Sequence, residues 1–357
     1  MFLVNLFVFL IFNELEKTSQ VIGLMYFYAK LRSYRMWGSI KQIPLLGQFL
    51  ILIGLYLIGE YVFLMLAIGL IDRIYPQMDF MSFVTNMNNI TSADQVTQPQ
   101  TDALKIYQFI TSFGRFVCVA LIFIYISGEK FITYLQLNKK LKFSSVLLIL
   151  LLFFASVSVI SLINEWNQNL HFPSGMSDAE ASLRKMEDQA KIFSDVFLNT
   201  TTVSGLIINI LLIGVLAAVG EEIFFRGLLQ NLFLKGIGNA HIAIWLSAFL
   251  FSFIHFQFFG FFPRMLLGAM LGYLFYWSGS LWAAILAHFI NNVVSVIAYY
   301  LVNIGAVDEN MAEQSSVVAA LVSVPFVVIL LIVFKRNEKV NLASDGAGLD
   351  DGVLDNG

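Results

Sequence analysis

Long apolar runs, separated by short polar stretches, follow one another along most of the chain. A helix needs roughly 20 apolar residues to cross the hydrocarbon core of a bilayer, and eight segments reach or approach this length. The expected spans are 47–71, 106–127, 143–163, 203–233, 240–259, 262–277, 281–303 and 316–334. The pattern therefore predicts an all-α fold, a polytopic bundle of about eight transmembrane helices.

Two longer polar stretches interrupt this pattern. Residues 73–105 are rich in Asn, Thr, Gln and Asp, which is typical of a loop, whereas the charges in 164–202 are spaced as on a surface helix. At the N-terminus, 1–46 is expected to be interfacial or weakly ordered, because the apolar run 2–12 is too short to span. The acidic, Gly-rich tail 341–357 is expected to be disordered.

Basic residues in the short connections predict how the bundle is oriented. If the chain crosses the membrane eight times, most basic residues of the connections lie on the same side. They are Lys30, Arg32, Arg35, Lys41, Lys130, Lys139, Lys140, Lys142, Lys235, Lys335, Arg336 and Lys339. Both termini are therefore expected to be cytoplasmic, and both long polar stretches extracytoplasmic. Arg264 falls on the opposite side and is expected to be an interfacial anchor.

Composition supports a membrane protein. The 357 residues are 58% hydrophobic and 13% charged, whereas a soluble domain carries about 25% charged residues. The formal net charge of −3 argues neither for nor against nucleic acid, and no such partner is expected. The single cysteine, Cys118, lies in an apolar run, so there is no disulfide framework.

The first polar cluster inside an apolar segment is GEEIFFR at 220–226. Charged groups in hydrocarbon are rare and usually functional. Glu222 and Arg226 are four residues apart and share a helical face, where they can form an ion pair. Glu221 points about 100° away and keeps a free carboxylate, which suits a general base. The alternative is a pair of helix-end glutamates at the cytoplasmic interface.

Two further apolar segments carry histidine. His255 ends FSFIH, and imidazole can orient water, accept a proton or bind a metal, although a lone histidine is more often a core residue. His288 and Asn292 are at i and i+4, hence on one face, and two donors converging there can hold an oxyanion. The alternative is hydrogen bonding between helices, a role that suits Asn291 better.

Other polar or small residues give weaker indications. His171 and His241 are expected to be solvated, and nothing in the sequence pairs with Glu60 in the first span. Gly268 and Gly272 form a small-xxx-small face, which is typical of close helix packing.

Three motifs, EExxxR, FxxxH and HxxxN, follow in this order on three apolar segments and resemble the CPBP family of intramembrane proteases. The family includes CAAX prenyl endopeptidases and bacterial relatives linked to bacteriocin processing and self-immunity. The resemblance covers about 203–303 and keeps every motif position. It implies a polar catalytic cavity. In that cavity Glu221 activates water with the help of His255. His288 and Asn292 hold the oxyanion, and Glu222 and Arg226 are supporting residues.

The apolar pattern predicts the organisation of the chain, and the resemblance, which does not extend to the N-terminal 200 residues or the acidic tail, adds a bacterial setting. We expect an N-terminal transmembrane region at 47–202 with two extracytoplasmic loops, a protease core at 203–303 and a last span within 304–340. The expected location is a bacterial cytoplasmic membrane. The expected partners are the lipid bilayer and a membrane-associated or leader-type peptide or protein, with the oligomeric state left open.

Metal dependence and two rival functions stay open. Glu221, His255 and His288 can supply three zinc ligands, but a ligating glutamate is not simply also the base. The chain has no HExxH, which favours a mechanism that requires no cofactor. The alternatives to an endopeptidase are a catalytically silent scaffold or bacteriocin-immunity protein and, third, a transporter, which the missing internal repeat disfavours.

Overall fold

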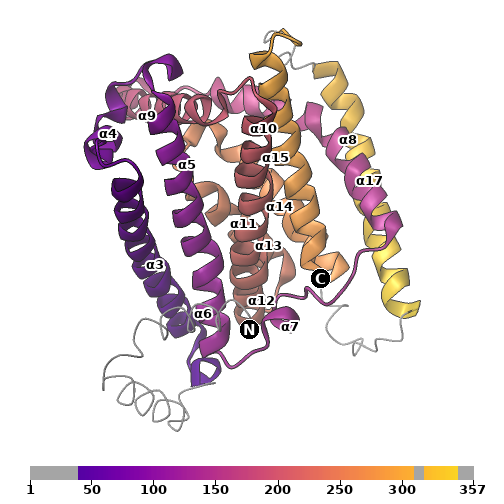
Figure 1. Cartoon of the computed structure of the whole chain (residues 1–357). Coiled ribbons are helices and arrows are strands. Elements are labelled where there is room, and N and C mark those ends of the chain that lie inside the picture. The colour runs from indigo at the N-terminus through magenta and orange to yellow at the C-terminus, as the bar shows by residue number, and fades with distance from the viewer. Residues whose placement is uncertain (1–38, 309–316, 345–357) are drawn as a thin grey trace, which may run out of the picture.

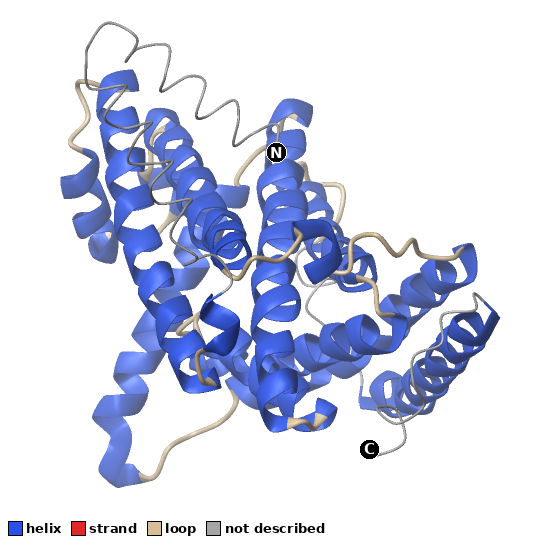
Figure 2. Cartoon of the chain, turned by 90° about the horizontal axis from the view of Figure 1, so that it is seen from below, coloured by secondary structure: helices blue, strands red, loops and turns tan. Residues whose placement is uncertain are grey.

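The structure, a computed structural model, describes residues 39–308 and 317–344. Within these ranges every regular element is a helix, as Figure 2 shows. Seven helices are long and apolar enough to cross a membrane, and α13 (Ala240–Phe253) is a shorter apolar helix. The predicted all-α polytopic bundle is confirmed, and the chain is an integral membrane protein. The predictions for 1–38 and 345–357 lie outside the described residues.

The N-terminal half forms one side of the bundle (Figure 1). Here α3 (Leu45–Ile74) packs against a continuous helical run made of α5 (Gln98–Ser112), the π-helix η4 (Phe113–Cys118) and α6 (Val119–Ile126). In the sequence between α3 and α5, α4 (Phe80–Asn86) forms within 73–105, the stretch predicted as a loop. The shorter elements are η1 (Ser39–Gln42), η2 (Met87–Asn89), η3 (Ala93–Gln95), α7 (Phe131–Tyr134) and η5 (Ser174–Met176).

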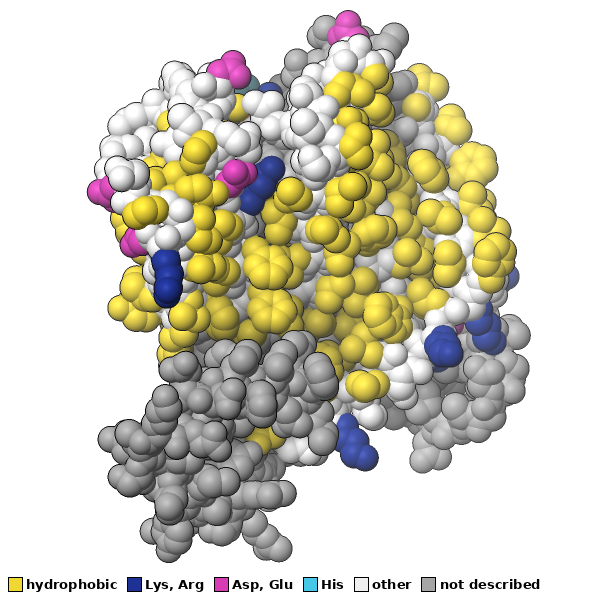
Figure 3. Space-filling view, in the orientation of Figure 1, with side chains coloured by type: hydrophobic (Ala, Val, Ile, Leu, Met, Phe, Trp, Pro, Cys, Tyr) yellow, Lys and Arg dark blue, Asp and Glu magenta, His cyan; other side chains and the backbone are white. Residues whose placement is uncertain are grey.

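On the other side, α8 (Phe143–Gln168) and α17 (Val317–Ser344) pack together (Figure 1). The surface helix expected within 164–202 is α9 (Ser177–Leu198), which lies across the end of the bundle that also carries α4. Figure 3 shows apolar side chains over the middle of one face and charged side chains mostly toward its edges. This distribution fits a bundle surrounded by lipid.

The centre of the bundle is one helical run from Val203 to Ile237 that contains two π-helical segments. Two π-helical segments, η6 (Ile210–Ala217) and η7 (Ile223–Gln230), flank α11 (Ala218–Glu222), and the run begins with α10 (Val203–Asn209) and ends with α12 (Asn231–Ile237). π-Helical turns are rare and often lie at functional sites. α11 carries both motif glutamates, and every residue of η7 is buried.

Three helices surround this run. α13, α14 (Phe261–Ser278) and α15 (Leu281–Asn303) all contact it, and α13 and α14 also pack closely on each other. Gly268 and Gly272 face that contact, because a Cβ on either would meet side-chain atoms within 3.2 Å. The small-xxx-small face therefore serves close helix packing, as expected.

The predicted span 240–259 is wrong at its C-terminal end. α13 stops at Phe253, and its 14 residues rise about 21 Å, less than the roughly 30 Å of the hydrocarbon core. A turn and the short 3-10 helix η8 (Phe258–Gly260) then reverse the chain into α14. Phe256 in this turn has a φ of 53°, a left-handed conformation that interrupts the helix and is costly for a non-glycine residue. His255 therefore lies on a turn inside the bundle.

Candidate active site

Glu222 and Arg226 form a fully buried ion pair. Arg226 Nη1 donates to Glu222 Oε1 at 2.7 Å, and both side chains are 0% exposed. Arg226 Nη2 donates to the Gly268 carbonyl of α14 at 2.9 Å, so the arginine also joins two helices. A buried charge is tolerated only when it is paired and hydrogen-bonded. The ion pair expected from the i,i+4 spacing is thus present, and it fixes the orientation of the Glu222 carboxylate.

His288 of α15 lies between the two motif glutamates. Its Nδ1 is 2.8 Å from Glu222 Oε1, and its Nε2 is 3.9 Å from Glu221 Oε2. Because an ionised carboxylate only accepts hydrogen bonds, Nδ1 is the donor, which leaves Nε2 facing Glu221. The 3.9 Å gap is too long for a direct hydrogen bond, and a gap of this size suits a bridging water.

Glu221 is the freer of the two glutamates. Its side chain is 15% exposed, whereas that of Glu222 is fully buried. Among the described residues no group donates a direct hydrogen bond to Glu221, and its nearest ionisable neighbour is His288. The helical spacing predicted that Glu222 pairs with Arg226 and that Glu221 does not, and the structure shows both.

His255 is held by its own turn. Its Nδ1 donates to the Phe251 carbonyl at 2.8 Å, which leaves a lone pair on Nε2. The Phe251 ring contacts both histidines, with centroid distances of 5.3 Å to His255 and 5.9 Å to His288. Within the described part of the chain no hydrogen bond joins His255 to Glu221 or His288. The two motif histidines are therefore neighbours of one phenyl ring rather than of each other.

Asn292 shares the face of His288, but its amide is engaged elsewhere. Its Nδ2 donates to the Ile213 carbonyl in the π-helix η6 at 2.9 Å, and its Oδ1 accepts from Asn291 Nδ2 at 3.2 Å. Asn292 thus ties α15 to the central run, and one of its two amide hydrogens stays unused by these contacts. The interhelical hydrogen bond that sequence reasoning attributed mainly to Asn291 is made by Asn292.

The candidate zinc ligands do not form one coordination set. In the described ranges no three His, Cys, Asp or Glu side chains are grouped as metal ligands would be. His255 Nδ1 is bound to the Phe251 carbonyl and His288 Nδ1 to Glu222, which leaves each Nε2 able to ligate a metal, so the spacing of the three side chains decides the question. In this structure Glu221, His255 and His288 do not fit a zinc ion, and we derive no step through one.

Sequence reasoning missed the arginine that pairs with Glu60. Arg115 of η4 places its Nε 3.1 Å from Glu60 Oε2 of α3. Glu60 therefore has an intramembrane partner, contrary to expectation. A lone basic residue within the apolar run 106–127 is a sequence feature that would have revealed it.

A polar network holds the turn that carries His255. Asn167 of α8, which is 0% exposed, accepts from the Phe262 amide at 2.9 Å and donates to the Phe258 carbonyl at 3.1 Å. Glu187 of α9 accepts from the Phe259 amide at 3.3 Å. Arg264, expected as an interfacial anchor, donates through Nη2 to the Gln257 side chain in the same turn, at 2.7 Å.

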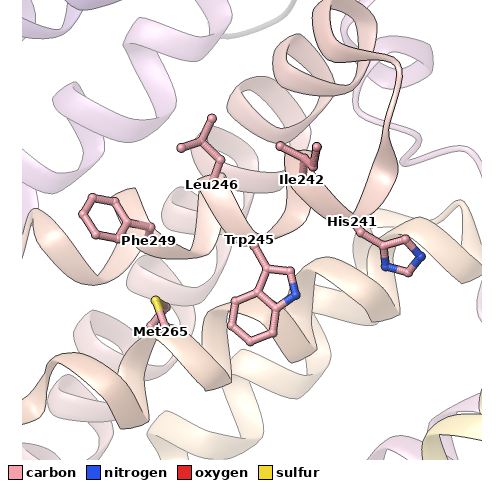
Figure 4. A pocket seen from close by; sticks show the side chains of 6 residues that line it. All are labelled: His241, Ile242, Trp245, Leu246, Phe249 and Met265. Atoms are coloured by element: carbon pink, nitrogen blue, oxygen red, sulfur yellow. The ribbon is translucent and has the colours of Figure 1, made fainter. Parts of the chain in front are cut away.

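An open apolar groove between α13 and α14 is distinct from this site (Figure 4). It is lined by His241, Ile242, Trp245, Leu246, Phe249 and Met265. His241 is exposed, as expected, and its Nδ1 lies 2.7 Å from the Tyr273 hydroxyl. None of the motif glutamates, histidines or asparagines lines this groove.

The comparisons with known proteins agree with the three motifs. Residues 203–294 match the family model described as Type II CAAX prenyl endopeptidase Rce1-like. This segment contains all three motifs, so the resemblance inferred from them is confirmed there, and it supports intramembrane protease function in general.

A second comparison concerns one curated relative. The chain is similar to the Uncharacterized protein YpbD of Bacillus subtilis (strain 168), with 27% identity over 143 residues. The matched region is 39% of this chain and spans 63% of the relative. No solved structure gives a significant match.

Proposed function

We propose that the chain is an intramembrane endopeptidase in which Glu221 activates the attacking water. The observation that carries the proposal is the arrangement around His288. One glutamate is bound to the arginine and to Nδ1, and the other is free and faces Nε2 of the same ring across 3.9 Å. A general base must have a carboxylate that can accept a proton. Glu221 has one, and the His288 ring beside it is held in place by Glu222.

In the proposed reaction a water lies between Glu221 and His288. Glu221 takes one proton of this water, and the oxygen attacks the carbonyl carbon of the peptide bond. The tetrahedral intermediate then breaks its C–N bond, and the proton on Glu221 passes to the leaving amine. Glu222 and Arg226 support the step by fixing the His288 ring, since a second residue that orients the histidine also sets its tautomer.

Asn292 and the two histidines have different roles in the proposed reaction. Asn292 offers its remaining amide hydrogen to the oxyanion, and each missing donor of this kind typically costs about 10²–10³ in rate. Because the Nδ1 atom of His288 is bound to Glu222, His288 donates to the oxyanion through Nε2 only after this nitrogen has taken a proton from solvent, separately from the proton that Glu221 carries. His255 presents its Nε2 lone pair toward substrate or water and thereby assists Glu221.

The proposed substrates are membrane-associated or leader-type peptides, and no cofactor is required. The proposed location is a bacterial inner membrane with both termini in the cytoplasm. The connections that carry Lys130, Lys139 and Lys235 lie at the end of the bundle with α7 and α12, opposite α9 (Figure 1). An excess of basic residues favours the cytoplasmic side for that end.

The test is cleavage by the full-length protein in liposomes, with a panel of membrane-anchored peptides and mass spectrometry of the products. We expect Glu221→Gln to abolish cleavage while the protein keeps its elution volume and melting temperature. Glu60→Gln is the matched control, because it removes another intramembrane carboxylate that does not face His288. Full cleavage by Glu221→Gln would contradict the proposal.

The same liposomes separate the rival functions. Ion or solute flux without peptide cleavage would indicate a transporter. A protein that neither cleaves nor transports would be a scaffold or immunity protein. If Glu221→Gln is inactive and folded, peptides that copurify with it identify the natural substrate class.

A further inference from the structure

The side-chain amide of Asn292 is held at both of its ends. Its Nδ2 donates to the Ile213 carbonyl in η6 at 2.9 Å, and its Oδ1 accepts from Asn291 Nδ2 at 3.2 Å. A backbone carbonyl has two lone pairs, so the Ile213 carbonyl can accept from a side chain besides its bond within the helix. One hydrogen bond alone would let the amide turn about that bond, whereas a second bond at the opposite end fixes the plane of the amide.

The same two bonds decide which atom of the Asn292 amide remains available. The Ile213 carbonyl can only accept, so Nδ2 rather than Oδ1 must face it. Asn291 occupies a lone pair of Oδ1 on the other side, which leaves the second Nδ2 hydrogen on offer. In the opposite orientation Oδ1 would lie against the Ile213 carbonyl, and two acceptors would face each other without a proton between them.

A glycine lets η6 approach α15 closely enough for this contact. Gly214 is buried next to Ile213, and a Cβ on it would lie 2.8 Å from Val293 Cγ2 and 3.6 Å from the Phe289 ring. Val293 is β-branched and stiff at χ1, so its methyl group cannot simply turn away. A larger residue in place of the glycine would therefore push the two helices apart and lengthen the bond from Asn292, which directly precedes Val293.

We propose that Asn291 and Gly214 are positioning residues, which fix the Asn292 amide so that its remaining hydrogen points at the oxyanion. This inference rests on the proposed endopeptidase function and adds to its site two residues outside the fixed positions of the three motifs. A donor that is aimed beforehand at the developing charge stabilises the transition state without reorganisation. The bond from Asn291 also polarises the Asn292 amide, because hydrogen bonds in a chain strengthen one another at low dielectric.

The test is a double-mutant cycle on peptide cleavage by the full-length protein in liposomes, with kcat and KM measured separately. Asn292→Leu removes the donor and should lower kcat by about 10²–10³. Asn291→Leu keeps the donor but frees its plane, and should lower kcat about tenfold, which corresponds to 1.4 kcal/mol, while KM and the melting temperature change little. In the Asn292→Leu background, Asn291→Leu should lower kcat no further, because no amide is left to position.

The glycine is tested from the other helix. Gly214→Ala should lower kcat several-fold, and adding Val293→Ala should restore most of the loss, because it removes the methyl group that the new Cβ meets. Ser295→Ala is the matched control on α15, because its hydroxyl donates to the Asn291 backbone carbonyl at 3.0 Å and not to the Asn292 amide. It should leave kcat unchanged.

A loss of kcat from Asn291→Leu that is as large in the Asn292→Leu background as in the wild type would overturn the inference, and so would no loss in either. Failure of the proposed function has a different signature, in which the wild-type protein cleaves none of the peptides, and the inference then falls with it. A wild-type protein that cleaves, together with additive losses in the cycle, would contradict the positioning roles alone.

Discussion

Two Arg–Glu pairs lie among the membrane-spanning helices in the part of the chain that the structure describes, and they differ in spacing, burial and hydrogen bonding. Arg226 and Glu222 are one helical turn apart, 0% exposed and joined by a 2.7 Å hydrogen bond, and His288 and the Gly268 carbonyl complete the network. Arg115 and Glu60 come from separate helices, are 23% and 33% exposed, and lie 3.1 Å apart without hydrogen-bond geometry.

The two pairs differ in how completely the surrounding protein encloses them. The first pair is fully buried, and its glutamate also contacts the imidazole of His288 at 2.8 Å. The second pair is a partly exposed contact between α3 and η4. Only the first is expected to contribute strongly to stability, since breaking a fully buried pair leaves a charge without compensation.

The largest effect is expected from Arg226→Met. It leaves Glu222 buried without its cation, which should destabilise the protein by about 3–5 kcal/mol, measured by reversible denaturation in detergent or by loss of folded protein in the membrane. The control Glu222→Gln/Arg226→Met removes both charges and should recover part of that loss. A cost for Arg226→Met no larger than that of Arg115→Met would contradict the comparison.

A smaller effect is expected from tightening the same core. Gly272→Ala places a Cβ 2.7 Å from Gln230 Oε1 and 2.9 Å from Ile244, and overpacking of this kind costs about 1–3 kcal/mol. Gly54→Ala on α3 is the matched control, because no atom lies within 4 Å of the added Cβ. Equal melting temperatures for the two variants would show that α13 and α14 are not closely packed.

For the Arg115–Glu60 pair we expect only a small change in the free energy of unfolding. Arg115→Met should cost only about 0.6 kcal/mol, the average for polar contacts between membrane helices. A double-mutant cycle with Glu60→Gln measures the coupling directly. A coupling energy of several kcal/mol would mean that this pair, too, is part of the rigid core.

The smallest effect is expected outside the membrane, where Glu180 of α9 gives a third kind of pair. The Phe172 amide and the Arg184 guanidinium lower the pKa of Glu180 to about 2. A lowered folded-state pKa adds stability above the ordinary pKa, and this contribution is lost as the pH falls toward the lowered value. Amide exchange in 170–176, corrected for intrinsic rates, should therefore stay protected from pH 7 to about 5.

Glu180→Gln should lose that protection at every pH, because it removes the charge. Asp178→Asn on the same helix is the control and should leave it unchanged. Protection that is the same in Glu180→Gln and wild type would show that this pair does not hold the loop before α9.

The polytopic helical fold and the Glu222–Arg226 pair could be predicted from the chain alone. Apolar runs of bilayer length are expected to cross the membrane as helices, because backbone N–H and C=O groups in lipid must find their hydrogen-bond partners within the segment. A spacing of four residues in a helix brings two side chains onto one face whatever surrounds them. For the same reason Glu221 could be recognised as the unpaired carboxylate.

The end of α13, the contact of His255 and His288 with one Phe251 ring, and the partners of Glu60 and Asn292 could not be predicted. Each depends on segments far apart in the chain, such as Asn167 and Glu187 holding the turn after α13. Sequence periodicity describes one helix at a time and contains no distance between helices.

The chain by itself thus determined which groups are chemically capable, namely two glutamates, two histidines and an asparagine placed in apolar helices. Only the tertiary structure decided that His288 lies between the two glutamates, that Asn292 is bonded to Ile213 and that Arg115 pairs with Glu60. The physical reason is that hydrogen bonds and ion pairs act over a few ångströms, and packing alone brings distant segments that close.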